Sequence, residues 1–422
     1  MTLFGLIDGN NFFVSCERIF RPDLTNKPVA VLSNNDGCFI SRSNEVKVLG
    51  IPMGAPLFKY KRLVNHYKIE VFSANFALYG DISNRLMGLV ASMVPRLEVY
   101  SIDEAFIDLT NTSTVLKKTQ HIRQQVFQGL GVPTCIGIAP TKTLAKVANY
   151  LAKKNAGYNG VCFLQDTKDI QVALKGLKVD EIWGVGRRLS LRFKEAGINT
   201  AYDLPQVDLR WMRQIFTVVG GRLVNELNGI SCFALDEQKD ANQSIQVTLS
   251  FDKDILNFDE LRSYMASYAA RLGLKLRQQA LKTANLLISI KTNRFKADFF
   301  QESFAIKLLQ AINDDTNLIK ACCQGLEKIY RPGLGYKKVG VMALDLRPAS
   351  HQQYSLFAED IFVTSKRENL VKVMDSLNKK YGIGTLHMAA CGAQLAWNDR
   401  KDKKSPAYTT SWQELPIVYA KR

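Results

Sequence analysis

The stretch YSIDEAF, residues 100–106, places two carboxylates side by side between apolar neighbours, in a chain of 422 residues with a formal net charge of +17. Its flanks, LEVYSI and AFIDLT, have the composition and spacing of two short strands in a hairpin. Adjacent side chains of a continuous strand point to opposite faces, whereas at a tight turn they can converge. The pattern therefore predicts a hairpin whose turn presents Asp103 and Glu104 to one ligand.

A third carboxylate, Asp8, ends the apolar stretch LFGLID, which is typical of a short buried strand. Carboxylates from neighbouring strands supply the hard oxygen ligands that Mg²⁺ prefers. Two such ions can stabilise the entering and leaving oxygens of a phosphoryl transfer. Spacing alone fits equally well a solvent-facing turn and one unrelated acid, but the scarcity of acids in this basic half favours a cation site.

The polar pair Asn10-Asn11 follows Asp8 and predicts the start of a helix near Phe12. The free backbone N–H groups at such a helix start can bind an anion such as a triphosphate. Phe12 and Phe13, by composition alone, are more usual as core residues.

Further strands and helices extend this pattern to about Gln165 and predict an α+β or α/β core. The expected strands are PVAVLS (28–33) and VPTCIGIA (132–139), and the expected helices are 44–50, 79–93 and 141–154. Residues 179–204 then predict two helical pieces around a Gly-x-Gly turn. After a polar break at 236–244, three strands and a helix predict a separate α+β domain. Beyond Arg347 the less periodic, polar sequence predicts a tail that is partly disordered or folds on a partner.

Basic residues concentrate in two segments that contain no Asp or Glu. The segment 109–165 carries Lys117, Lys118, Arg123, Lys142, Lys146, Lys153 and Lys154. The segment 261–297 carries Arg262, Arg271, Lys275, Arg277, Lys282, Lys291, Arg294 and Lys296. We expect two surfaces that contact a phosphate backbone, although two solvated faces also fit this pattern.

The eight cysteines form no C-x-x-C pair and only four histidines accompany them, so we expect reduced thiols without a zinc site or disulfide framework. No apolar run is long enough to span a membrane, and the N-terminus has no basic leader. We therefore expect a cytoplasmic protein without a membrane partner.

Five motifs, in this order and spacing, resemble the Y-family translesion DNA polymerases, most closely the UmuC-type catalytic subunits of bacterial DNA polymerase V. They are DGNNFFVSCE (8–17), SRSNEVKVLGIPMG (41–54), YSIDEAFIDLT (100–110), GIAPTKTLAKVAN (137–149) and IWGVGRR (182–188). The resemblance covers nearly the whole chain. It implies a multidomain α+β protein with the right-hand polymerase architecture and a DNA-directed DNA polymerase activity with two Mg²⁺ ions.

The resemblance also assigns roles to matching positions. The implied catalytic metal ligands are Asp8, Asp103 and Glu104, with the Gly9 carbonyl as an additional contact. The implied nucleotide-binding residues are Phe12, Phe13, Ser41, Lys47 and Lys153. Phe13 would be the steric gate that excludes a ribose 2′-OH; UmuC-type sequences often have Tyr there, and relatives often have Arg at the position of Lys47, which keeps the charge but loses bidentate geometry.

The family's domains would divide this chain into palm and fingers at 1–165 (fingers about 11–75), a thumb at 166–236, a little finger at 243–350 and a C-terminal tail at 351–422. The thumb would contact DNA phosphates through a helix-hairpin-helix containing Gly184, Gly186 and Arg187. In the tail, Gln353, Leu356 and Phe357 resemble a sliding-clamp peptide. The family further implies a processed UmuD-like dimer and RecA as partners, with primed template DNA and deoxynucleoside triphosphates as substrates.

The sequence thus predicts an error-prone translesion polymerase of the SOS response. Two rivals share its basic surfaces and carboxylates: a non-catalytic DNA-binding repair scaffold and a metal-dependent nuclease. A nuclease does not readily explain an aromatic steric gate five residues after Asp8.

Overall fold

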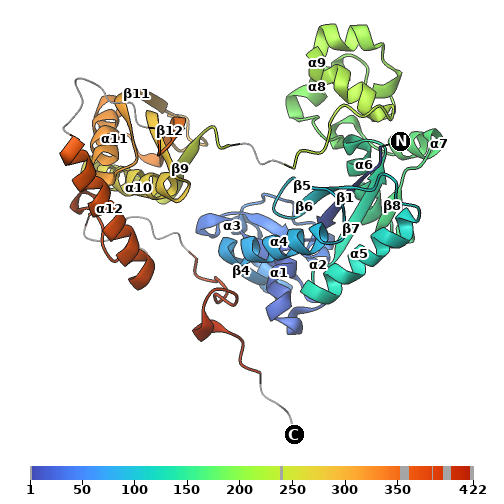
Figure 1. The fold of residues 1–422 in the computed structure, drawn as a ribbon, viewed down its shortest axis with the longest axis horizontal. Helices are drawn as coiled ribbons and strands as arrows, with labels where there is room; N and C mark the ends of the chain where they lie inside the picture. The colour runs from blue at the N-terminus through green and yellow to red at the C-terminus, as the bar shows by residue number, and fades with distance from the viewer. Residues whose placement is uncertain (1, 238–240, 352–360, 383, 393–400, 419–422) are drawn as a thin grey trace. The chain divides into compact units, whose positions relative to one another are not determined.

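The computed structural model describes residues 2–237, 241–351, 361–382, 384–392 and 401–418 (Figure 1). The chain divides into two compact units. The first unit comprises Met1–Lys239 and Arg400–Arg422, and the second comprises Asp240–Asp399. Within the described ranges, no helix has both the length and the apolar character that crossing a membrane requires.

The first unit contains two sheets and nine α-helices among its described residues. Its strands are β1 (Phe4–Gly9), β2 (Val29–Leu32), β3 (Phe39–Arg42), β4 (Glu70–Ser73), β5 (Leu97–Val99), β6 (Glu104–Asp108), β7 (Thr134–Ala139) and β8 (Val161–Phe163). Its helices are α1 (Phe12–Phe20), α2 (Asn44–Val48), α3 (Leu57–His66), α4 (Phe76–Ala91), α5 (Val115–Leu130), α6 (Lys142–Lys154), α7 (Thr167–Lys175), α8 (Arg187–Glu195) and α9 (Leu209–Leu227).

The larger sheet has the strand order β5-β6-β1-β7-β8, with β1 antiparallel to both of its neighbours. Alternation along each strand gives the sheet two buried faces. Ile7 and its neighbours Ile107 and Ile136 pack in one core with α1, α4 and α5. Leu6 and Phe106 point the other way, into a second core that includes α6. The smaller sheet, β3-β2-β4, has its own core with α2 and α3.

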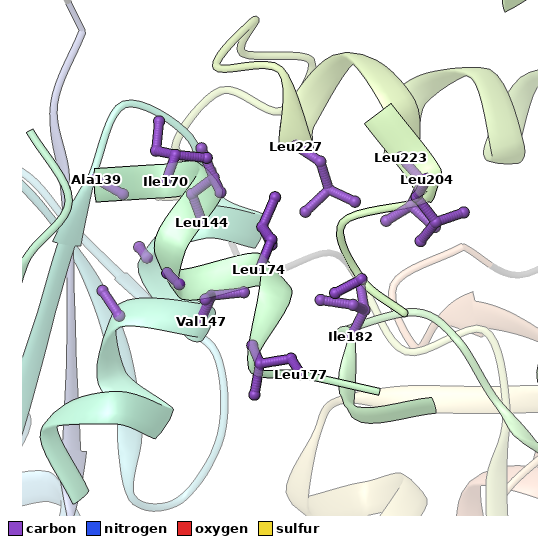
Figure 2. Packing of buried hydrophobic residues seen from close by; sticks show 14 of the residues in the cluster. Ala139, Leu144, Val147, Ile170, Leu174, Leu177, Ile182, Leu204, Leu223 and Leu227 are labelled. Atoms are coloured by element: carbon purple, nitrogen blue, oxygen red, sulfur yellow. The ribbon is translucent and has the colours of Figure 1, made fainter. Parts of the chain in front are cut away.

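The core on the α6 side of the larger sheet continues into α7, α8 and α9 (Figure 2). Figure 2 shows Leu144 and Val147 of α6 close to Leu174 of α7, with Leu223 and Leu227 of α9 lining the same interior. Residues beyond Gln165 therefore share buried apolar surface with the sheet that carries Asp8.

Most of the expected elements form close to their predicted positions. β5 and β6 pair antiparallel around the turn at 100–103, which confirms the predicted hairpin. A helix does begin at Phe12, as the polar pair Asn10-Asn11 predicted, but no asparagine side chain caps it. Asn11, with φ 49°, lies in the left-handed region and makes no capping hydrogen bond with its side chain.

The second unit contains one four-stranded sheet of order β11-β10-β12-β9, packed against helices α10 and α11. Its elements are β9 (Ile245–Ile255), α10 (Phe258–Gln278), β10 (Leu281–Thr292), β11 (Gln301–Ile312), α11 (Asp315–Ile329), β12 (Tyr336–Pro348) and α12 (Ile361–Tyr381). The sequence reading missed β11 and α11, although β11 alternates exposed and half-buried residues along its length.

The described parts of the chain beyond Arg347 are more regular than expected. α12 runs for 21 residues, and its Asp375 accepts hydrogen bonds of 2.7 and 2.9 Å from the guanidinium of Arg277 on α10. Lys282 of β10 forms a 2.9 Å ion pair with Glu368 of the same helix. The expectation of a phosphate-binding surface is therefore not met at Arg277 and Lys282, because both cations hold α12 on this unit.

Candidate active site

Asp8 on β1 and Glu104 on β6 lie directly opposite each other in the antiparallel ladder. Residues two apart along a strand share a face, so Asp8 points the same way as Leu6, and Glu104 the same way as Phe106. That face is the one covered by α6. Asp8 is 5% exposed, which places a carboxyl almost entirely inside the protein.

Three lysines on one side of α6 pair with three acids of the sheet. Lys153 lies 2.5 Å from Asp8, Lys146 lies 3.0 Å from Glu104, and Lys142 pairs with Glu98 on β5. Spacings of four and seven residues bring these lysines to the same side of the helix.

α6 sits unusually close to β7. A Cβ atom on Gly137 would lie 2.1 Å from the Asn149 backbone nitrogen, a distance no side chain can occupy. The Asn149 amide, in turn, donates 3.1 and 3.0 Å hydrogen bonds to the carbonyls of Leu6 and Cys135. Gly137 therefore sets the depth at which the lysines of α6 meet the carboxylates.

Asp103 belongs to the turn and is held there by local hydrogen bonds. The Ser101 hydroxyl donates to Asp103 Oδ1 over 2.7 Å and accepts from the backbone N–H groups of Asp103 and Glu104. The Gly9 N–H donates to the Asp103 carbonyl over 2.9 Å, which ties the turn to the end of β1.

The electrostatics of the three acids differ. Burial raises the pKa of Asp8 to about 7, against the opposing charge of Lys153, and the hydrogen bond shared with Glu104 adds to the rise. Burial also raises the pKa of Asp103. For Glu104, burial is outweighed by the hydrogen bond from Asp8 and the charges of Lys146 and Lys153, so its pKa is lowered. The three pKa values therefore move in different directions, because burial, shared hydrogen bonds and the lysine charges act on each acid to a different extent.

This donor set fits a hard divalent cation. Asp8, Asp103 and the Gly9 carbonyl offer only oxygen, and a buried carboxyl with a raised pKa is a group that a bound cation would ionise. Within the described ranges, no group of three or more His, Cys, Asp or Glu residues has the geometry to hold a metal ion by itself. Lysine ammoniums hold the carboxylates instead.

A cavity of about 240 Å³ opens beside these acids, between β1, α1, β3 and α2. Of the nine residues predicted to bind metal or nucleotide, eight line this cavity, and the ninth, Glu104, is the ladder partner of Asp8. The lining predicted residues are Asp8, Gly9, Phe12, Phe13, Ser41, Lys47, Asp103 and Lys153. The structure thus brings together positions that are up to 145 residues apart in the chain.

The predicted gate residue, Phe13, is held by aromatic neighbours on α4. Its ring stacks on Tyr79 with centroids 4.6 Å apart and an interplanar angle of 15°, and it meets the edge of Phe76 at 5.9 Å. Phe12, 3% exposed, packs beneath Gly9, where a Cβ atom would lie 2.9 Å from the Phe12 ring. Phe13 lines the cavity from a stacked, fixed position.

The sequence reading missed four further residues of the cavity wall: Asn11, Ile40, Arg42 and Met53. Arg42 is the most informative, because it donates to the Ile51 carbonyl and its charge, after burial, contributes to lowering the pKa of Lys47. Ser41 and Arg42 are neighbours, so the motif SRSNEVK already contained the signal.

Four of the seven basic residues in the first acid-free segment pair with acids or a backbone carbonyl of the protein itself. Lys142, Lys146 and Lys153 pair with acids of the sheet, and Arg123 on α5 donates 2.7 Å to the Thr134 carbonyl. These cations neutralise and brace the site from within.

The remaining predicted residues lie outside this cavity. Gly184, with φ +87°, precedes Gly186, the N-cap of α8, and a Cβ atom on either would touch nothing within 4 Å. Gly184 is therefore required by backbone conformation, and Arg187 begins the helix. Gln353, Leu356 and Phe357 lie outside the described residues.

Three protein-family models match the chain. Residues 7–150 match the impB/mucB/samB family, residues 242–356 match the C-terminal domain of that family, and residues 368–418 match a domain of unknown function.

Similar curated proteins extend over almost the whole chain. Protein ImpB of Salmonella typhimurium is 39% identical over 99% of both chains, and Protein UmuC of Salmonella typhimurium is 40% identical over 98% of this chain and 99% of the relative. DNA polymerase IV 1 of Bacillus subtilis is 27% identical over 94% of each.

The fold is similar to solved polymerases. A Y-family DNA polymerase chimera of Dbh and Dpo4 matches with a TM-score of 0.67 and 21% identity, over 81% of this chain and 98% of that one. An insertion ternary complex of Dbh DNA polymerase matches with a TM-score of 0.53 and 20% identity over the same shares.

Proposed function

The chain belongs to the impB/mucB/samB family and has the fold of the Y-family DNA polymerases, and on this premise we propose that its cavity joins deoxynucleotides to a primer opposite a template strand. It is a DNA-directed DNA polymerase, a nucleotidyltransferase of the error-prone translesion type that acts in the SOS response to DNA damage. The observation that carries the proposal is the cavity itself, which gathers acids, lysines and a stacked aromatic ring in its lining.

Asp8, Asp103 and Glu104 would hold Mg²⁺ together with the Gly9 carbonyl. Two bound ions would supply charge stabilisation at the attacking and leaving oxygens of nucleotidyl transfer. The protein's own part is to place and neutralise these acids: Ser101 orients Asp103, while Lys146 and Lys153 keep Glu104 and Asp8 charge-balanced until substrate arrives.

Lys47, Lys153 and Ser41 would bind the triphosphate, and the start of α1 would add backbone N–H donors. Burial, together with the charges of Arg42, Lys153 and Lys154, lowers the pKa of Lys47, so the part of the cavity around Lys47 is rich in positive charge. Arg42 lines the same cavity. An anion that enters the cavity relieves this repulsion between like charges.

Phe13 would contact the sugar of the incoming nucleotide. A ribose 2′-OH at that contact would clash with the ring, so selection for deoxyribose rests on steric exclusion. The ring has little freedom to give way, because Tyr79 and Phe76 hold it from the side of α4.

The proposal divides the chain into palm and fingers, thumb, little finger and tail at the boundaries expected from the sequence. Gly184, Gly186 and Arg187 would contact DNA phosphates without reading bases. The second unit would contact the template-primer duplex through cations not engaged by α12.

The protein partners proposed are a processed UmuD-like dimer, RecA and the sliding clamp, the last through Gln353, Leu356 and Phe357. Gel filtration and pull-down of the full chain with each partner, beside a Leu356→Ala, Phe357→Ala variant, would test the clamp assignment separately.

Primer extension tests the function. The purified chain, with Mg²⁺ and deoxynucleotides, with and without its UmuD-like and RecA-like partners, should lengthen a primed template. The Asp103→Ala, Glu104→Ala variant should lose at least about 10²-fold of this rate, the size expected for removing a central electrostatic stabiliser, while still binding DNA.

The rival readings give different products. A nuclease would shorten the primer, and a repair scaffold would leave it unchanged. Extension that is equal in the variant and the unmodified chain would overturn the assignment of the two carboxylates.

A further inference from the structure

A short segment near the C-terminus, residues 403–408, packs against the C-terminal part of α1 and the N-terminus of α4 within the first unit. We call it the C-terminal strap. Its backbone continues the smaller sheet: the Ser73 N–H donates to the Lys403 carbonyl over 3.0 Å, and the Lys403 N–H donates to the Ser73 hydroxyl over 3.0 Å. The Tyr408 ring stacks on Phe20 of α1 with centroids 4.5 Å apart.

Ser405 is the buried centre of the strap, at 6% exposure. Its hydroxyl accepts a 3.0 Å hydrogen bond from the side chain of Asn75 and donates a 3.1 Å hydrogen bond to Glu17 Oε1. Asn75 also donates to the carbonyls of Ser405 and Pro406. A hydroxyl that both donates and accepts inside the protein fixes both of its partners.

Both hydrogen-bond partners of Ser405, Glu17 and Asn75, support the aromatic rings that contact Phe13. Glu17 lies on α1, one turn beyond Phe13, and its Oε1 also accepts a 2.7 Å hydrogen bond from the Tyr79 hydroxyl, whose ring stacks on Phe13. Asn75 is the N-cap of α4 and accepts from the Leu78 N–H. The first turn of α4 carries Phe76 and Tyr79, the two rings that contact Phe13.

From these contacts we propose that the C-terminal strap is a positioning element for the sugar-selecting ring, acting through Ser405, Glu17 and Tyr79. The inference rests on the proposed function and adds to it: discrimination between deoxyribonucleotides and ribonucleotides depends on a residue 388 positions away from Glu17 in the sequence. Ser405 is outside the cavity and touches neither metal ligands nor substrate. It is a positioning residue and not a catalytic one.

The geometry explains why the effect should fall on sugar choice. Phe13 excludes a 2′-OH only while its ring cannot tilt, and Tyr79 is its stacking partner. The hydrogen bond from the Tyr79 hydroxyl to Glu17 fixes the position of the Tyr79 ring. Ser405 donates the second hydrogen bond to the same Glu17 oxygen. Loss of the Ser405 hydroxyl leaves a buried carboxyl with one donor fewer and frees the Asn75 amide, which loosens both supports of the ring.

The test measures kcat/KM for a deoxynucleotide and for the matching ribonucleotide in single-nucleotide primer extension by the full chain. In Ser405→Ala, the ratio of the two should fall roughly two- to tenfold, the size of one hydrogen bond, mainly through faster ribonucleotide incorporation. Thr410→Ala is the matched control, because Thr410 is exposed just beyond the strap and should leave the ratio unchanged.

A double-mutant cycle separates positioning from general destabilisation. Tyr79→Phe keeps the stacked ring but removes the hydroxyl from the opposite side of Glu17, so it should also lower the ratio. The two changes together should lower it by less than the product of their separate effects. If Ser405→Ala fails to extend primers even with deoxynucleotides, Tyr79→Phe alone decides the matter.

An unchanged ratio of kcat/KM for the deoxynucleotide and the ribonucleotide in both Ser405→Ala and Tyr79→Phe would overturn the proposal. A double variant whose ratio falls by the full product of the two separate effects would also overturn it. Failure of the unmodified chain to extend a primer with deoxynucleotides would instead overturn the proposed function, so the two failures are distinguishable.

Discussion

Two buried carboxyls lie nine residues apart in this chain and have opposite surroundings. Asp8, at the end of β1, faces Lys153, a hydrogen-bonded Glu104 and an open cavity. Glu17, on α1, is fully buried and receives its hydrogen bonds from two neutral hydroxyls, those of Tyr79 and Ser405. A carboxyl among cations beside a cavity can exchange partners when a ligand enters, whereas a carboxyl enclosed by hydroxyls can only hold its neighbours in place.

The same isosteric change at the two positions should have very different effects on catalysis. Asp8→Asn keeps the volume but removes a charge that metal binding requires, so primer extension should fall by at least about 10²-fold. Glu17→Gln keeps an acceptor for both hydroxyls, so extension with deoxynucleotides should stay within a few-fold of the unmodified chain. Extension rates at saturating Mg²⁺, with DNA affinity as the control, measure both. Equal losses in the two variants would show that the two carboxyls do not differ in their role in catalysis.

The pairing of Asp8 with a lysine depends on how closely α6 approaches the sheet. Gly137→Ala would place a Cβ atom 2.1 Å from the Asn149 backbone nitrogen and 2.3 Å from the Ala145 carbonyl. Because both contacts are backbone atoms, the helix must move, and we expect a loss of about 3 kcal/mol or more in the free energy of unfolding, beyond ordinary overpacking.

Urea unfolding of the two glycine variants checks this. Gly88→Ala on α4 is the matched control, since a Cβ atom there meets nothing within 4 Å and alanine favours a helix by about 1 kcal/mol over glycine. A Gly137→Ala protein as stable as the control would show that the approach of α6 is not set by this contact.

The surroundings of Asp8 were predictable from the sequence, and those of Glu17 were not. Asp8, Asp103 and Glu104 stand in local patterns, a strand end and a hairpin turn, and their convergence follows from strand alternation once β1 and β6 are neighbours. The lysines of α6 were visible too, but their one-signed segment suggested a phosphate surface. Acids that pair with them lie on β1, β5 and β6, outside that segment, so a local charge count could not show that they are paired.

Glu17, Tyr79 and Ser405 carry no local signal. Each is an ordinary residue of its segment, and their meeting depends on a backbone pairing between Ser73 and Lys403 that spans 330 residues. The polar sequence beyond Arg347 suggested a loose tail because hydrophobic periodicity, the main guide to structure in a sequence, is weak there. A strap held by backbone hydrogen bonds and one buried serine does not need that periodicity.

The smallest expected effect is on stability as a function of pH, and it isolates Glu17. Burial raises the pKa of Glu17 above its ordinary value of 4.5, so between 4.5 and the raised value the folded chain binds more protons than the unfolded chain. The contribution of Glu17 to stability is therefore fully present below pH 4.5 and declines as pH rises through the folded-state pKa. Glutamine does not titrate, so the free energy of unfolding of the unmodified chain, minus that of Glu17→Gln, should fall as pH rises above 4.5.

Neighbouring groups should not obscure this difference, because Tyr79, Cys16 and Tyr408 all have pKa values raised above their ordinary ones and stay neutral in that range. Paired urea unfolding curves at several pH values between about 4 and 8 measure it. A difference that rises with pH would mean that Glu17 is ionised more readily in the folded chain than in the unfolded one. Its enclosure by hydroxyls would then stabilise a charge, as the lysines do at Asp8, and the contrast between the two carboxyls would lie only in access to the cavity.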